Sequence, residues 1–243
     1  MLMLHTHRLT RFGRVLRRLR ANQSGIALVE FAYATPVLLL LITGGAELAN
    51  YSITSMRLSA LALQIADNAS RIGEGDPMAA KKISEAQIND LMLGALAQGG
   101  NLNVNGTYSE KQSNGSSVNK NKARIIISSL EPDPDSAHAG RNYIHWQRCY
   151  GLDTSYTPQY GTEGTHNITG MGPTGRQVFA PTGTAMIFVE LHFRYEPLFP
   201  LINPQKLGIM NYRDINTVAA MVVRDDRDLS QIYNTEAVTA STC

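Results

Sequence analysis

A long apolar stretch near the N-terminus is the strongest constraint on what this chain can fold into. From Phe31 to Ala46 the chain has 16 uncharged residues, which would measure about 24 Å as a helix at 1.5 Å per residue. Residues 26–29 extend this stretch toward the roughly 30 Å of a bilayer's hydrocarbon core. The sequence therefore predicts one membrane crossing, and no second apolar run of this size follows it.

The charges in front of this stretch predict its orientation. No acidic residue precedes it, whereas the leader is rich in arginine: Arg8, Arg11, Arg14, Arg17, Arg18 and Arg20. By the positive-inside rule, such a leader keeps the N-terminus in the cytoplasm. The rest of the chain is then expected beyond the inner face of the membrane.

Three interpretations of this N-terminus are open from composition alone. A secretory signal peptide would have its apolar core over residues 37–42 and small residues, Gly44 and Ala46, before a cut. A single-pass anchor needs no special residue. The leader, with an apolar face over residues 9–19, also has the composition of an organellar transit peptide, although basic amphipathic leaders are common beside anchors.

The residues after the apolar stretch disfavour a cut there. Between Leu48 and Ile72 apolar residues recur every three to four positions, which is the period of an amphipathic helix. We expect one helix over residues 26–72, kinked near Pro36 and loosened at Gly44 and Gly45. Asp67 and Arg71 would pair one turn apart on its polar side. The apolar side comprises Leu58, Ala62, Ile65, Ala69 and Ile72.

A glutamate inside the apolar stretch indicates a family. Gly25, Glu30 and Phe31 together resemble the processing site of type IV prepilins, and residues 24–70 are similar to the TadE/TadG family. The resemblance implies that the prepilin peptidase, a membrane aspartyl protease, cuts between Gly25 and Ile26. It further implies a pseudopilin or minor pilin of the bacterial tight-adherence (Tad) pilus. Such a protein works in the inner membrane with other pilin-like subunits and the Tad secretion machinery.

The predicted cut would give Glu30 a partner. A carboxylate at mid-bilayer costs roughly 2.5–3.5 kcal/mol unless it is paired. Cleavage would create an amine at Ile26, which a neighbouring subunit's Glu30 could accept in the helix bundle. Alternatively, Glu30 is simply hydrated, since it lies only about 7 Å from the cytoplasmic edge.

The chain beyond the membrane is long enough for one domain. We expect a cytoplasmic leader (1–25), a transmembrane helix (26–48), its periplasmic extension (49–72) and a periplasmic α+β domain (73–243). Asp76 and Pro77 read as a cap and first-turn proline that open a helix over residues 78–98. Residues 99–122, rich in Asn, Gly and Ser, are expected to be a surface loop.

Four segments after this loop have the composition of strands. They are rich in β-branched and aromatic residues and are separated by turn residues. An antiparallel sheet packed on the outer half of the long helix, a pilin-like α+β fold, is therefore expected. Residues 193–224 also resemble the C-terminal part of TadE-like proteins. The segments are 123–130, 142–150, 184–195 and 215–223.

Two cysteines, Cys149 and Cys243, lie 94 residues apart. Outside the cytoplasm an even number of cysteines permits a disulfide, which type IV pilins often use to fix their C-terminal region. In the chain-entropy model this bond would stabilise the fold by about 4 kcal/mol. Two unpaired thiols remain the alternative, because sequence spacing does not establish proximity.

No catalytic motif, cofactor site or metal site stands out. Residues 170–175 fit G-x-G-x-x-G, but Pro173 denies the helix that a dinucleotide site requires. His145 and Cys149 would share a strand face without a third ligand. Asp133 and Asp135 flank a proline and are expected to make a turn. No nucleophile is evident for a further histidine to activate. These further histidines are His138, His166 and His192.

The expected function is accordingly non-enzymatic, with membrane lipid and protein subunits as partners. The net charge of +2 comes mainly from the leader, and nothing indicates a nucleic-acid-binding surface. The alternative is a membrane-anchored envelope enzyme or ligand-binding protein with a pocket at the loop over residues 151–175. Such a pocket would be lined by titratable groups with shifted pKa values.

Overall fold

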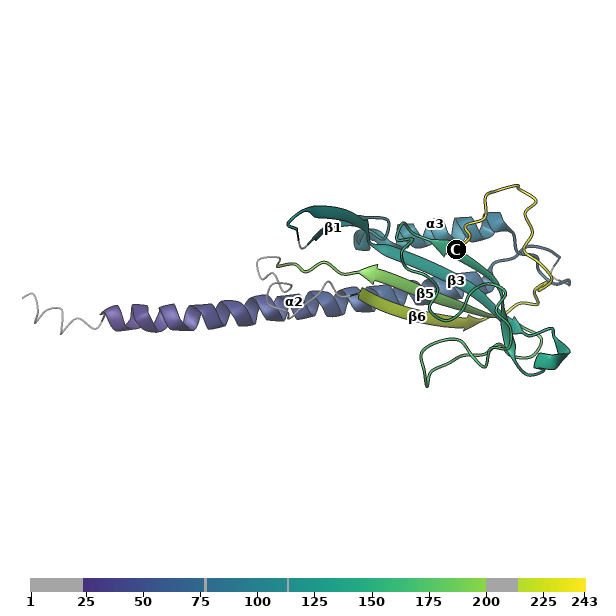
Figure 1. Ribbon diagram of the computed structural model, residues 1–243, viewed down its shortest axis with the longest axis horizontal. Coiled ribbons are helices and arrows are strands. Elements are labelled where there is room, and N and C mark those ends of the chain that lie inside the picture. Colours follow the sequence, from purple (N-terminus) through teal and green to yellow (C-terminus); the bar gives the residue numbers. More distant parts are fainter. Residues whose placement is uncertain (1–23, 77, 113, 200–213) are drawn as a thin grey trace, which may run out of the picture. The chain divides into compact units, whose positions relative to one another are not determined.

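The computed structural model describes residues 24–76, 78–112, 114–199 and 214–243 (Figure 1). The arginine-rich leader, Pro77 and Pro200 therefore lie outside the described residues. The chain divides into two compact units, Met1–Ala49 and Asn50–Cys243. Helix α2 (Ser24–Arg71) contributes residues to both units.

Helix α2 confirms the long helix that the apolar period predicts. It is 48 residues long and remains helical through Pro36, Gly44 and Gly45. Near its end Arg71 and Asp67 pair at 2.8 Å, as expected from their spacing of one turn. The pair is largely exposed, so its contribution to stability is below about 1 kcal/mol.

The second helix begins later than the sequence prediction. Helix α3 spans Glu85–Gly99, so the predicted start near Met78 is wrong. The reason is a stronger cap farther along the chain: the Ser84 hydroxyl accepts the N–H of Gln87, and the Gln87 side chain accepts the N–H of Ser84. This reciprocal capping box satisfies two N–H groups of the first turn. Asp76 instead closes a tight turn by accepting the N–H of Met78.

The predicted loop over residues 99–122 contains a β-hairpin, which corrects the expectation of a structureless segment. After the short 3₁₀ helix η1 (Gly100–Leu102), strand β1 (Thr107–Lys111) pairs antiparallel with β2 (Ser117–Asn121). The described residues of β2 are almost all exposed. The hairpin thus has little apolar periodicity, which is why its composition resembles that of a loop.

The four predicted strands form one antiparallel sheet. They are β3 (Ala123–Pro132), β4 (Asn142–Tyr150), β5 (Met186–Arg194) and β6 (Asp214–Val222), in the spatial order β4-β3-β5-β6. The 3₁₀ helix η2 (Ser136–His138) lies in the connection between β3 and β4. The α+β class is therefore confirmed.

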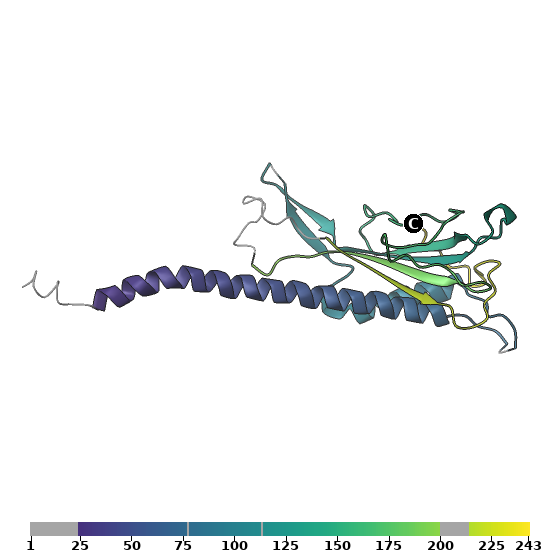
Figure 2. The ribbon, with the colours of Figure 1, turned by 90° about the horizontal axis from the view of Figure 1, so that it is seen from below.

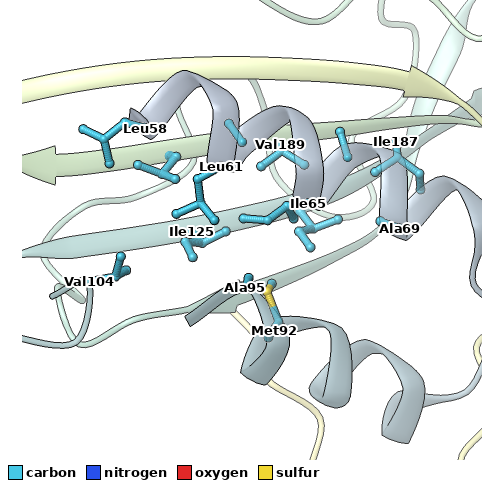
Figure 3. Close-up of a cluster of buried hydrophobic side chains, with 14 of the residues drawn as sticks. Leu58, Leu61, Ile65, Ala69, Met92, Ala95, Val104, Ile125, Ile187 and Val189 are labelled. Carbon is cyan, nitrogen blue, oxygen red and sulfur yellow. The ribbon is translucent and has the colours of Figure 1, made fainter. Parts of the chain in front are cut away.

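One face of the sheet packs against helices, with α3 and residues 50–71 of α2 on the same side (Figures 2 and 3). Ile65 of α2, Met92 of α3 and Ile125 of β3 are all at most 1% exposed in this cluster. Burial of one such side chain contributes roughly 1.5–3 kcal/mol. The other described members labelled in Figure 3 are Leu58, Leu61, Ala69, Ala95, Val104, Ile187 and Val189.

The opposite face of the sheet is covered by the long connection between β4 and β5. Met171 and Ala180 of this connection are buried with Leu130 and Phe188 of the sheet. Both faces are thus covered, which explains why nearly every residue of β3 and β5 is buried. A strand buried on both faces reads as a continuous apolar run and not as an alternation.

A β-bulge sets the two faces of β4. Ser129 pairs with Trp146, whereas the next residue, Leu130, pairs with Ile144, so His145 has no partner in the register. A bulge of this kind interrupts the strict alternation of side chains. As a result Trp146 belongs to the helix-side cluster, while Ile144 belongs to the cluster on the opposite face.

Candidate membrane anchor and assembly segment

The N-terminal half of α2 exposes apolar side chains on all sides. Phe31 is 66% exposed and Leu41 is equally open, whereas a soluble helix would bury one face. Among the described residues, one helix, Gly25–Arg71, is long and apolar enough to cross a membrane. The helix meets criteria of length and apolar composition, which a signal sequence near the N-terminus would also meet.

Two threonine hydroxyls within this apolar half of α2 are satisfied locally. The hydroxyl of Thr35 donates to the carbonyl of Phe31 at 2.6 Å, and that of Thr43 donates to the carbonyl of Leu39 at 2.7 Å. Such back-bonding removes unpaired hydroxyls from the helix surface. A segment in lipid must satisfy its polar groups internally, so this arrangement suits a membrane environment.

Glu30 has no such local bond with a described residue. Its side chain is exposed, and no ion pair or hydrogen bond joins it to another described residue. It lies one helical turn after Ile26, which is also exposed. No described residue of the same chain therefore offsets the cost of placing the charged Glu30 side chain on an apolar surface.

Gly25 directly precedes Ile26 in the helix. A Cβ atom added there would meet no described atom within 4 Å. The fold of the chain consequently does not demand glycine at this position, where glycine costs about 1 kcal/mol relative to alanine inside a helix.

The C-terminal tail is fixed to β4 by a disulfide. Cys149 and Cys243 are bonded, with their Cα atoms 4.8 Å apart. The N–H of Cys149 also donates to the carbonyl of Ser241 at 2.7 Å. Disulfides persist in oxidising compartments and are rare in reducing ones.

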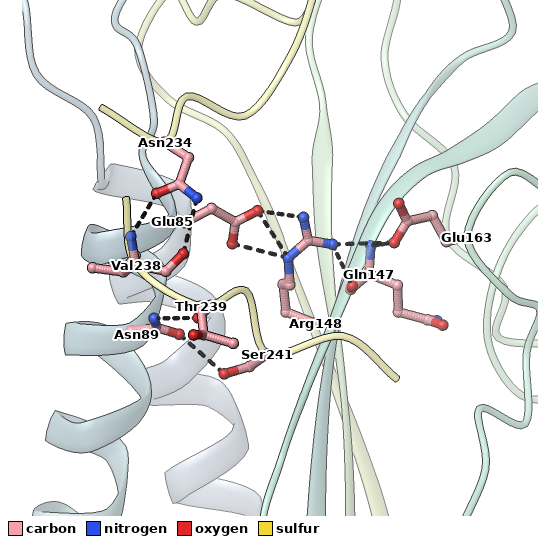
Figure 4. A network of polar contacts seen from close by, with 9 residues as sticks. All are labelled: Glu85, Asn89, Gln147, Arg148, Glu163, Asn234, Val238, Thr239 and Ser241. Carbon is pink, nitrogen blue, oxygen red and sulfur yellow. Dashed lines mark hydrogen bonds and ion pairs between the residues drawn. The ribbon is translucent and has the colours of Figure 1, made fainter. Parts of the chain in front are cut away.

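A buried ion pair lies beside this tail (Figure 4). Arg148 of β4 donates to both carboxylate oxygens of Glu85, with its shortest bond at 2.5 Å, and a second bond reaches Glu163 at 3.1 Å. Burial by itself would lower the pKa of Arg148, but the hydrogen bonds and charges of Glu85 and Glu163 raise it. The pair joins α3 to the sheet, and sequence reasoning missed it because its members lie 63 positions apart.

The tail also contacts α3 directly. Asn89 donates to the carbonyl of Thr239 at 3.0 Å and accepts from the Ser241 hydroxyl at the same distance (Figure 4). In addition, the N–H of Glu85 donates to the carbonyl of Tyr233. The last residues are therefore held by α3 as well as by the disulfide.

His145, Cys149 and His192 each contact other residues of the fold. His145 contacts Glu131 at 2.9 Å and Cys149 is in the disulfide, so the shared face that strict alternation predicted for them is lost with the bulge. Of residues 170–175, Met171 pairs with Val178 as a bridge, and residues 172–175 lie in the turn between these two. His192 is buried and contacts Asn216 at 2.7 Å.

The long connection over residues 151–175 packs onto the sheet through Tyr160, Ile168 and Met171. A cavity of about 420 Å³ lies elsewhere, between the end of α2 and the outer side of α3. The pocket that the enzyme alternative expects at this connection stays a prediction.

The structure does bring three of the considered side chains together. Asp133, His138 and His166 place one ligand atom each within 4.8 Å of the others. Asp133 also makes the expected turn, since its Oδ1 accepts the N–H of Asp135. The sequence shows only that these residue types can bind metal. It does not show that they are close, because His166 is 33 positions from Asp133.

Comparison with protein families gives a match at the N-terminal helix. Residues 25–67 match the family described as TadE-like protein. Comparison with curated proteins found no match, and neither did comparison with solved structures. The match covers the apolar segment with Glu30 and most of the amphipathic part of α2. Over residues 25–67, this chain is thus similar to TadE-like proteins.

Proposed function

We propose that this chain is a pilin-like membrane protein that takes part in the assembly or structure of a Tad-type pilus. The observation that carries the proposal is the TadE-like match over residues 25–67, which coincides with the apolar helix. In this proposal the prepilin peptidase cuts after Gly25, and the mature protein acts by helix packing. Its N-terminus faces the cytoplasm, and the domain with the Cys149–Cys243 disulfide lies in the periplasm.

The exposed surface of α2 supports packing as the mode of action. Apolar side chains surround the segment from Ile26 to Leu48, so lipid and neighbouring helices can contact every side of it. Apolar contact with other helices is no better than contact with lipid tails, and a polar group is needed for specificity. Glu30 is the acidic group within the first turns of that segment.

Glu30 then sets the axial register between subunits. After cleavage, the new amine at Ile26 lies about 6 Å along the helix axis from Glu30. A neighbouring helix shifted by about one turn brings its own amine level with this carboxylate. In a medium of low dielectric the two charges attract strongly, whereas either charge alone is costly. Phe31, 66% exposed beside Glu30, supplies apolar contact to the same neighbour.

The experiment is complementation in Tad-piliated cells that lack the gene for this chain. Glu30→Ala and Glu30→Gln are compared with Asp90→Asn, which removes one exposed carboxylate from α3. We expect all variants to insert in the membrane, and only the Glu30 variants to lose co-purification with pilin-like subunits and surface pili. Normal assembly in both Glu30 variants would remove the register role, and unchanged pili in the deletion strain would contradict the proposed function.

A further inference from the structure

We propose that Asp133, His138 and His166 form a binding site for a divalent transition-metal ion, with Zn²⁺ as the best match. The three residues come from the end of β3, from η2 and from the connection that pairs with the start of β4. This inference concerns the compact unit Asn50–Cys243, called the outer domain below, and it does not depend on the apolar half of α2 that carries the proposed function. Two imidazoles and a carboxylate are ligands that zinc accepts, whereas Mg²⁺ and Ca²⁺ prefer oxygen.

The ligand atoms, one from each residue, lie within 4.8 Å of one another. Oδ1 of Asp133 lies 2.9 Å from Nδ1 of His166, and Oδ2 lies 3.2 Å from Nδ1 of His138. Ligands about 2.0–2.1 Å from a tetrahedral zinc lie roughly 3.3 Å from one another. Small rotations of the two rings would therefore allow one ion to contact all three residues.

The carboxylate is held in place before any ion binds. The side chain of Asp133 is 0% exposed. Its Oδ1 accepts the N–H of Asp135 at 3.0 Å, and its Oδ2 accepts the N–H of Asn167 at 2.9 Å. Each oxygen thus accepts one backbone N–H and also faces an imidazole nitrogen.

The two imidazoles lack other partners for the nitrogens that face Asp133. Nδ1 of His138 is buried and forms no hydrogen bond with any described group, although it lies near the carboxylate. The His166 ring stacks on Tyr143, with centroids 5.1 Å apart and planes 12° apart. This stacking fixes the orientation of the ring, as the outer-shell contacts of metal ligands do.

A fourth ligand is available beside the three. Oδ2 of Asp135 lies 3.6 Å from Nδ1 of His138, and its side chain is half exposed. The His166 side chain is 46% exposed, so solvent reaches the site. Asp135 or water can complete a tetrahedral shell, and two carboxylates with two neutral imidazoles would balance the charge of Zn²⁺. Binding would join the connection after β4 to the end of β3.

The test is zinc binding by the full-length chain, purified in detergent without a histidine tag and stripped by a chelator. Titration against a chromophoric chelator should give one Zn²⁺ per chain and a higher thermal midpoint with zinc than without it. Asp133→Asn and His166→Gln should each weaken binding by more than about 100-fold. His145→Gln is the matched control, because His145 lies beside Tyr143 but contacts Glu131. The zinc affinity of this variant should be unchanged.

A second measurement does not depend on the variants folding. In the unsubstituted protein, ¹⁵N NMR should show zinc bound through Nδ1 of His138 and His166, with Nε2 of both rings protonated. Absence of stoichiometric zinc binding would overturn the proposal. So would binding that persists in Asp133→Asn, binding lost equally in His145→Gln, or coordination through other histidines.

Discussion

Glu85 and Arg148 form a buried ion pair that joins the first turn of α3 to strand β4. Their side chains are only 6% and 9% exposed, and two nitrogens of the guanidinium contact the carboxylate. Glu85 also lies at the positive end of the α3 dipole, which favours its negative charge. The pair fixes the position of the helix against the sheet close to the disulfide that fixes the tail.

Loss of either partner of this pair should strongly destabilise the outer domain. Arg148→Met leaves the buried Glu85 carboxylate without its partner, which costs about 3–5 kcal/mol. Glu85→Gln leaves Arg148 with only the half-exposed Glu163 and should cost somewhat less. Denaturant unfolding of the full chain in detergent, followed by tryptophan fluorescence from Trp146, measures the change. Arg71→Gln is the control, since it breaks an exposed pair and should cost under about 1 kcal/mol.

The double variant Glu85→Gln with Arg148→Met tests whether the two residues act as a pair. It removes both charges together, so part of the lost stability should return. Additive losses in the double variant would show that the two residues do not act as a pair.

The disulfide should stabilise the outer domain mainly through the unfolded chain. Cys243→Ser opens a loop that spans 94 positions, and we expect a loss of about 4 kcal/mol of unfolding free energy. The tail should then become sensitive to protease, although Asn89 still holds Thr239 and Ser241. Equal stability of the unsubstituted chain with and without reductant would refute this role.

Helix α2 should contribute to the core of the outer domain through one face only. Ile65 is 1% exposed, and Ile65→Ala should cost about 2–5 kcal/mol by lost burial and a residual cavity. Leu63→Ala is the matched control, because Leu63 lies two positions away and is 51% exposed. It should change stability by under about 0.5 kcal/mol. Similar losses in the two variants would contradict the packing of this face.

Glu190 should make stability depend on pH. Burial raises the pKa of Glu190 from 4.5 to about 7, and the N–H groups of Gln159 and Tyr160 offset part of that effect. Between these values the folded chain keeps a proton that the unfolded chain has released, so stability falls as pH rises from 4.5 to 7. The contribution lost by pH 8 is on the order of 3 kcal/mol.

Glu190→Gln should remove this slope. The amide cannot ionise, so the variant should unfold at a higher denaturant midpoint than the unsubstituted chain at pH 8 and near the same midpoint at pH 5. Parallel pH profiles for the two proteins would show that Glu190 titrates normally.

The elements that the sequence predicts well are those with strong local periodicity. The apolar period of α2 and the β-branched runs of β3 and β5 depend on residues close in the chain. The predicted start of α3 is wrong because Asp76 and Pro77 resemble a helix start, whereas Ser84 and Gln87 form the actual capping box. That Ser-x-x-Gln spacing is visible in the sequence and could have located the helix.

Contacts between distant segments could not be predicted in this way. The hairpin β1–β2 lacks an apolar face, so its composition gives no strand period. The pairing of Glu85 with Arg148 depends on how α3 meets the sheet. Likewise, Asp133 and His166 meet only because the connection after β4 folds back onto that strand's first residue, Asn142.

The most direct test of the account is the N-terminus of the mature chain, read by mass spectrometry from membranes of cells that contain the prepilin peptidase. The account predicts a chain that begins at Ile26, and it predicts that Gly25→Leu blocks processing, because a bulky side chain would crowd the protease at the cut. The fold tolerates a side chain at Gly25, so this variant should still insert. A mature chain that keeps its leader, or one that begins at Glu47, would contradict it.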